Sequence, residues 1–277
     1  MLPDDGYRWK VPDQHSEPTR SDDATARLDA GEVLDDHSGL RRRRMRTDWR
    51  VGGRAVSRWN SRVLAAALFG AGVGMLTAGM IGRLGQPWAP AASAVAVSLG
   101  LGAAIVYALV RSRPAGLLRF RAVDVLWGLG LGLSLRLLQG ALSDVNHRPF
   151  PALPGVQTGE SDGSIVTTIS QAMFVGPVAE EFFFRALVLV SIYQLLRRSV
   201  GSFAAGLTGA LVSAGSFVLI HAVFEALSLS DALQLFALGA ACSAVVLLTG
   251  RIWPAVLAHI VYNASFVLLA ALGSILA

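Results

Sequence analysis

Three groups of ionisable and amide side chains stand inside long apolar stretches of this chain. Such side chains are costly to keep in lipid-like surroundings, so each one is a candidate for a functional role. Carboxylates and imidazoles can take a proton from water, and they can also bind a divalent metal. The groups are EEFFFR (Glu180, Glu181 and Arg185), FVLIH (Phe217 to His221) and HIVYN (His259 to Asn263).

Helical spacing separates the two neighbouring carboxylates. Glu181 and Arg185 are four residues apart, so on a helix they share one face and can form an ion pair. Glu180 is rotated by about 100° from Glu181 and is left without a helical partner. If the pair is structural, Glu180 is the free carboxylate, available as a base or as a ligand.

The two histidine groups supply complementary chemistry. His259 and Asn263 are four residues apart, and their N–H donors project from one helical face, which suits the binding of an oxyanion. Imidazole also suits zinc, and the candidate ligands are then Glu180, His221 and His259. Phe217 lies one turn before His221 and is expected to pack against that ring or to orient it.

Structural explanations exist for each group taken alone. A single His or Asn in a membrane helix often makes an interhelical hydrogen bond, and a Glu–Arg pair four residues apart is often structural. Packing alone does not explain all of them together in three apolar segments. The chain has neither a zinc-binding HExxH helix nor the GxSxG turn of a serine hydrolase.

The composition indicates a membrane protein. Of 277 residues, 53% are hydrophobic and only 16% are charged. Apolar segments recur at the length of about 20 residues that spans a bilayer. We therefore predict an all-α polytopic bundle with about seven spans, near 62–82, 89–110, 123–142, 165–196, 203–225, 232–249 and 253–275.

Charged residues gather before the first span. Residues 1–58 hold 12 of the 24 Lys and Arg and 11 of the 19 Asp and Glu, so we predict a disordered tail there and a transmembrane domain over 59–277. The clusters RRRRMR (41–46) and RSRPAGLLRFR (111–121) place the N-terminus in the cytoplasm by the positive-inside rule. We expect these arginines to serve membrane topology or to contact lipid headgroups, with no nucleic acid as partner.

Two of the candidate residues, Glu180 and His221, are predicted to lie at a similar depth from the inner side of the membrane, and His259 is not. Glu180 lies about 25 Å along a helix from Arg197, and His221 about 30 Å from Gly201. His259 lies only about 12 Å from Arg251. Either the sixth helix stops short, with its turn at 249–251 lining a cavity, or the predicted boundaries are wrong.

Taken together, the three groups resemble the CPBP family of intramembrane proteases, which includes type II CAAX prenyl endopeptidases and the Abi group. The family pattern is Glu-Glu-x-x-x-Arg, then Phe-x-x-x-His, then His-x-x-x-Asn. The chain carries it as EEFFFR, FVLIH and HIVYN, and LTGRIWPAVLAH (248–259) is similar to the family's lead-in to its last motif. The resemblance covers about 165–265.

The resemblance implies an intramembrane endopeptidase acting on a membrane-associated peptide or protein. Glu180 and His221 would activate water, His259 and Asn263 would stabilise the oxyanion, and Glu181 and Arg185 would hold the architecture. The motif leaves open a zinc enzyme, in which the metal brings the pKa of water to about 7, and a metal-independent one with Glu180 as base.

We expect an integral protein of a bacterial plasma membrane. A non-proteolytic scaffold or immunity protein is the alternative, because sites are grafted on folds. A proton-coupled transporter is a weaker one, because the chain shows no internal symmetry.

Overall fold

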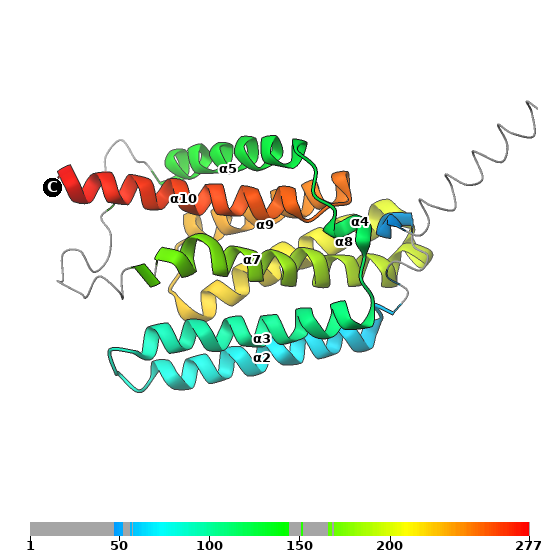
Figure 1. The fold of residues 1–277 in the computed structure, drawn as a ribbon, viewed down its shortest axis with the longest axis horizontal. Coiled ribbons are helices and arrows are strands. Elements are labelled where there is room, and N and C mark those ends of the chain that lie inside the picture. The colour runs from blue at the N-terminus through cyan, green and yellow to red at the C-terminus, as the bar shows by residue number, and fades with distance from the viewer. Residues whose placement is uncertain are drawn as a thin grey trace, which may run out of the picture. The chain divides into compact units, whose positions relative to one another are not determined.

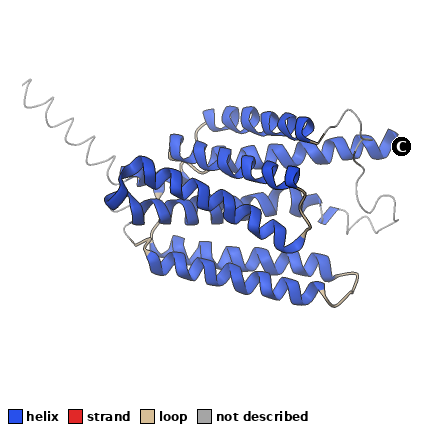
Figure 2. Cartoon of the chain, turned by 180° about the vertical axis from the view of Figure 1, so that it is seen from behind, coloured by secondary structure: helices blue, strands red, loops and turns tan. Residues whose placement is uncertain are grey.

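The structure is a computed structural model that describes residues 47–51, 56, 58–143, 151, 166–167 and 169–276. Regular structure in these residues is helical, and no strand occurs among them (Figure 2). This agrees with the predicted all-α class. The elements are η1 (Trp49–Val51), α2 (Ser61–Gly82), α3 (Ala89–Arg111), α4 (Ala115–Leu118), α5 (Val123–Leu142), η4 (Gln171–Val175), α7 (Gly176–Glu181), η5 (Phe182–Leu189), α8 (Val190–Phe224), α9 (Leu229–Thr249) and α10 (Trp253–Leu276).

Six helices are long and apolar enough to cross a membrane, and one of them is a 54-residue run from Gln171 to Phe224. That run holds both the fourth and the fifth predicted spans. It reverses at Gly201, whose φ of 82° is a conformation that glycine adopts readily (Figure 1). The hydroxyl of Ser213 then donates to the carbonyl of Phe184 at 3.0 Å, across the two antiparallel halves. The described chain therefore runs in seven apolar segments, as predicted.

The first half of this run is the centre of the bundle. It is α-helical in α7, widens to a π-helix over η5 and becomes α-helical again in α8. Residues 183–191 are all buried, which is typical of a helix enclosed by others on every side. Stretches of π-helix often occur at functional sites. This one directly follows the two adjacent glutamates.

Helices α2 and α3 form a hairpin that packs closely along its length (Figure 1). Gly100 of α3 lies against the backbone of Gly70 and Gly74 in α2. A Cβ added at Gly100 would lie 2.6 Å from the Gly70 carbonyl oxygen and 2.8 Å from the Gly74 Cα. Small residues at such crossings let helix backbones approach in lipid.

Helices α5 and α10 form a second close pair (Figure 1). Arg136 of α5 donates through Nε to the hydroxyl of Ser265 at 3.0 Å and through a second nitrogen to the carbonyl of Tyr262. Its guanidinium also lies 4.1 Å from the centre of the Tyr262 ring. Arg136 thus joins two helices through carbonyl, hydroxyl and ring contacts.

The predicted tail boundary at residue 58 falls within a segment that packs on the bundle. Trp49 is fully buried, and its indole N–H donates to the carbonyl of Gly250 at 3.0 Å. The hydroxyl of Tyr193 donates to the carbonyl of Arg50 at 3.1 Å. Residues 1–46, for which we predicted disorder, lie outside the described residues.

The α2–α3 contact gives a direct test of the packing. We expect Gly100→Ala to lower the free energy of unfolding by about 1–3 kcal/mol, because the added methyl group forces the two backbones apart. Gly102→Ala is the matched control, since a Cβ at Gly102 meets nothing within 4 Å. Thermal unfolding of both purified variants in one detergent measures the difference. Equal midpoints would contradict the close approach.

Candidate active site

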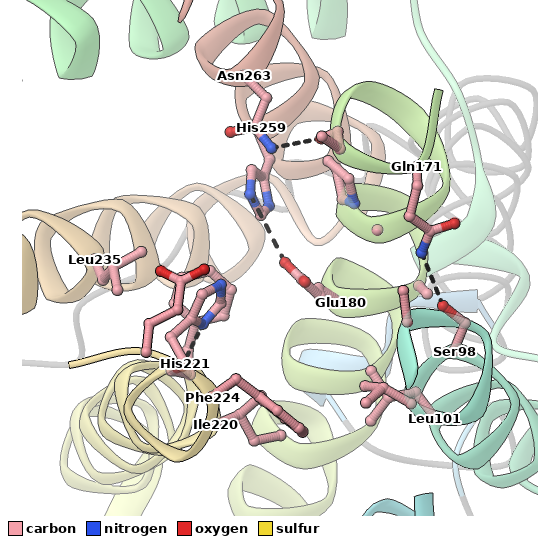
Figure 3. Close-up of a pocket in the computed structure, with 18 of the residues that line it drawn as sticks. Ser98, Leu101, Gln171, Glu180, Ile220, His221, Phe224, Leu235, His259 and Asn263 are labelled. Carbon is pink, nitrogen blue, oxygen red and sulfur yellow. Dashed lines mark hydrogen bonds and ion pairs between the residues drawn. The ribbon is translucent and has the colours of Figure 1, made fainter. Parts of the chain in front are cut away.

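A cavity of about 620 Å³ opens between α3, α7, α9, α10 and the end of α8. Its wall is mostly apolar, and four of the residues predicted from the sequence line it together: Glu180, His221, His259 and Asn263. Figure 3 shows them around one space, with Glu180 and His259 directed toward each other. The sequence segments that carry them are far apart, and the helical bundle brings them together.

The carboxylate of Glu181 is the buried centre of the site. It pairs with Arg185, four residues on, at 3.0 Å, and both side chains are fully buried. The same oxygen, Oε1, also accepts a hydrogen bond from Nδ1–H of His259 at 2.9 Å. The predicted pairing of Glu181 and Arg185 is therefore present. The contact with His259 adds a second function, because it fixes the orientation of that ring.

The guanidinium of Arg185 is held mainly by charge and by aromatic faces. Its nitrogens make no hydrogen bond with good geometry in the described chain, although the ion pair with Glu181 is short. Its carbon lies 4.7 Å from the ring centre of Phe217 and 5.6 Å from that of Phe184. A cation over an aromatic face is favourable when both are desolvated.

Glu180 faces the cavity and has no arginine partner among the described residues. Its side chain is 23% exposed, in contrast to the fully buried Glu181. Oε2 of Glu180 lies 3.8 Å from Nε2 of His259, which is longer than a hydrogen bond. The carboxylate is therefore close to an imidazole and still free to accept a proton.

Both imidazoles are fixed through Nδ1. His221 Nδ1 lies 2.9 Å from the carbonyl of Phe217, and a carbonyl only accepts, so Nδ1 carries the proton. The Phe217 ring packs 4.6 Å from the His221 ring and 5.7 Å from the His259 ring, between centres. Phe217 thus positions His221 by backbone and ring, as its spacing suggested. In neutral form each histidine keeps a lone pair on Nε2.

Asn263 is engaged in a contact that spacing alone did not suggest. Its Nδ2 donates to the carbonyl of Ala172 in η4 at 2.7 Å. A carboxamide has two N–H donors, so one remains available. One turn of π-helix at the cavity wall is thereby tied to α10.

Several lining residues were missed by the sequence analysis. Glu225 lines the cavity one turn after His221, and Gln171 donates to the hydroxyl of Ser98 at 3.0 Å across the wall. The spacing of Glu225 from His221 was a usable signal. Nothing in the sequence pointed to Ser98, which lies on a helix outside the three motifs.

Zinc binding stays a prediction. The three candidate ligands are donors that zinc accepts, and the Nδ1 contacts of both histidines resemble those that orient metal-binding imidazoles. Among the described residues, however, no three His, Cys, Asp or Glu side chains are grouped closely enough to hold a metal ion. Glu180, His221 and His259 therefore do not fit a metal as they stand, and no step below is assigned to one.

Comparison with known families agrees with this geometry. Residues 163–265 match the family model described as type II CAAX prenyl endopeptidase Rce1-like. This stretch is therefore an Rce1-like domain, from a family of CAAX-type intramembrane proteases, as the three motifs predicted. The match and the apolar helices identify an integral membrane protein. A search of curated proteins and a search of solved structures gave no match.

The buried pair can be tested by a double-mutant cycle. Glu181→Gln leaves the Arg185 charge unpaired in an apolar interior, which costs about 3–5 kcal/mol for a buried pair. Glu181→Gln with Arg185→Met removes both charges, so we expect the double variant to be more stable than Glu181→Gln alone. Unfolding in one detergent measures all four proteins. Additive losses would show that the two charges do not depend on each other.

Proposed function

We propose that this protein is an intramembrane endopeptidase that hydrolyses a peptide bond of a membrane-associated protein or peptide. The observation that carries the proposal is that two adjacent glutamates, Glu180 and Glu181, have different surroundings. One carboxylate is neutralised by Arg185, and the other faces the cavity 3.8 Å from the His259 ring. His221 lines the same cavity, and the Nδ1–H groups of both imidazoles are already bonded. Such a site can bind one water molecule between a base and a second acceptor.

The proposed chemistry needs only groups of the chain. A water molecule donates one hydrogen bond to Glu180 and one to Nε2 of His221. Its oxygen attacks the peptide carbonyl carbon while Glu180 takes the proton. The C–N bond then breaks, and the proton passes from Glu180 to the leaving nitrogen. The products are a new carboxylic acid and a new amine, and transfer of the acid proton between them gives a carboxylate and an ammonium group.

His259 and Asn263 are assigned to the oxyanion. The second N–H of Asn263 can donate to the developing negative charge. His259 can donate only if Nε2 is also protonated, because its Nδ1–H is bonded to Glu181. The carboxylates of Glu181 and Glu180 flank that ring and would balance the positive charge of the imidazolium form. Zinc content of the purified protein and of His221→Ala distinguishes this route from a metal-dependent one.

Substitution of the base tests the proposal. We expect Glu180→Gln and His221→Ala each to reduce cleavage by about 10²–10⁴-fold, the range that a general base contributes. Processed peptides in cells that express the wild type, compared with Glu180→Gln cells, identify a substrate. Cleavage of that substrate by the purified proteins then gives the rates.

Glu225→Gln is the control for charge in the cavity, and we expect its loss to be far smaller than that of Glu180→Gln. All variants should be monodisperse and should unfold at similar temperatures. Normal processing by Glu180→Gln would overturn the endopeptidase assignment. If the same variant also kept the cellular phenotype, the non-proteolytic scaffold would be favoured.

We also propose that the end of the bundle carrying the turns at Gly201 and Gly250 faces the cytoplasm of a bacterial cell. Arginines cluster in the described connections at that end, at 111–121, 197–198 and 251, whereas the α2–α3 connection at the opposite end has only Arg83. By the positive-inside rule this asymmetry orients the chain. The segment before α2 then starts on the cytoplasmic side.

Cysteine labelling checks the orientation. Cys242 is buried and is the only cysteine, so Cys242→Ala gives a cysteine-free background. Gln86→Cys and Ser199→Cys then place exposed thiols at opposite ends of the bundle. We expect a membrane-impermeant maleimide to label Gln86→Cys in intact cells and Ser199→Cys only after the cells are opened. The reverse pattern would invert the proposed topology.

A further inference from the structure

A second cavity lies at the end of the bundle where α9 turns into α10, and the proposed chemistry does not use it. Its volume is about 200 Å³. Residues from three segments distant in sequence form its wall, within 47–50, 116–121 and 249–251. None of them lines the candidate active site.

The wall of this cavity is strongly basic. Four of its nine lining residues are arginines, at positions 50, 119, 121 and 251, and Asp48 is the single acid among the nine. A sixth charged group, the buried Asp124, lies behind Arg251 and pairs with it. With four cations and two anions, the cluster keeps a net charge of two positive units.

Two of the arginines are fixed in place. Nε of Arg251 lies 2.9 Å from Oδ1 of Asp124, and a second guanidinium nitrogen donates to the same carboxylate. Arg50 pairs with Asp48 at 2.9 Å and also donates to the last carbonyls of α9, at Leu247 and Leu248. These contacts hold one part of the wall rigid before any ligand arrives.

The other two arginines supply the uncompensated charge. The guanidinium groups of Arg119 and Arg121 form no hydrogen bond or ion pair within the part of the chain that the structure describes, and both side chains are exposed. An arginine guanidinium presents a fork of N–H donors that matches the oxygens of a phosphate. The guanidinium groups of Arg119 and Arg121, beside the fixed Arg50 and Arg251, therefore suit an anion with several oxygens.

The position of the cavity indicates where that anion comes from. Three indole N–H groups donate to backbone carbonyls at this end of the bundle, and tryptophan is enriched at the interface between lipid and water. The negative groups at that depth are the phosphates of anionic lipids. The indoles and their acceptors are Trp49 and Gly250, Trp59 and Ala108, and Trp253 and Leu118.

We propose that this cavity binds a phosphate group, and that the phosphate is the headgroup of an anionic phospholipid. Arg119 and Arg121 contact its oxygens, and Arg50 and Arg251 form the fixed basic wall. The proposal does not rest on the protease activity. A bound lipid would join the α3–α5 connection to the α9–α10 turn, the turn that precedes the helix carrying His259 and Asn263.

Lipid binding to the full-length protein in a neutral detergent tests the proposal, because a micelle has no charged surface to attract arginines in general. Phosphatidylglycerol and phosphatidylcholine are titrated and bound lipid is counted by native mass spectrometry. We expect Arg119→Gln with Arg121→Gln to weaken phosphatidylglycerol binding by roughly 30-fold, about fivefold for each arginine. The control, Arg62→Gln with Arg113→Gln, removes equal charge from exposed residues outside the cavity.

The outcomes separate the two sources of phosphate. The lipid headgroup is supported by two results together. The preference for phosphatidylglycerol is lost only in the cavity variant, and millimolar glycerol phosphate or inorganic phosphate does not displace the bound lipid. Competition by those soluble phosphates supports the phosphate site and overturns the lipid as its source. Equal losses in both double variants, or none, overturn the site. Both side chains are exposed, and their guanidinium groups form no hydrogen bond or ion pair with the described residues, so the variants should fold.

Discussion

The architecture of the site depends on one buried carboxylate. Glu181 is fully enclosed, and an isolated charge there would be prohibitively costly. Arg185 compensates it within the same helix, and His259 binds the same oxygen from α10. The contact between Glu181 and His259 therefore determines how α7 packs against α10. It also sets the direction of the His259 ring, and hence the direction in which its second nitrogen faces the cavity.

The fixed pair explains how two adjacent glutamates can have different properties. Both face an apolar bundle, and two free carboxylates so close would repel each other. Arginine neutralises Glu181 four residues away, whereas Glu180 is rotated toward the cavity and remains partly exposed. The same division holds for the imidazoles, since each uses Nδ1 for a structural contact. Structural and reactive functions are thus separated within single side chains as well as between neighbours.

Much of this arrangement could be predicted from the sequence, because apolar length and helical spacing are local properties. The seven segments, the Glu181–Arg185 pair and the lack of an arginine partner for Glu180 among the described residues all follow from them. Contacts between distant segments do not. The hydrogen bond from Asn263 to Ala172 depends on a π-helical turn. The packing of Trp49 depends on where the Gly201 turn and the α9–α10 turn lie relative to each other. The break between the fourth and fifth predicted spans was placed correctly around Gly201, but the tightness of the turn was not predicted, because a single glycine with positive φ replaces a loop.

The depth of His259 shows how such a distant contact determines the site. Trp49 donates to the carbonyl of Gly250 and packs edge-on against Tyr193, with 5.3 Å between ring centres. Gly250 and Tyr193 therefore lie at the same level along the length of the bundle. The Gly201 turn then extends about 12 Å beyond the Gly250 turn, so the sixth span does stop short. From this common level, His259 is about 14 Å along α10 and Glu181 about 18 Å along the central helix. The segment around Trp49, which sequence composition assigns to a tail, thus fills the space left because the Gly250 turn stops short of the Gly201 turn. This difference in height brings His259 to the level of the two glutamates.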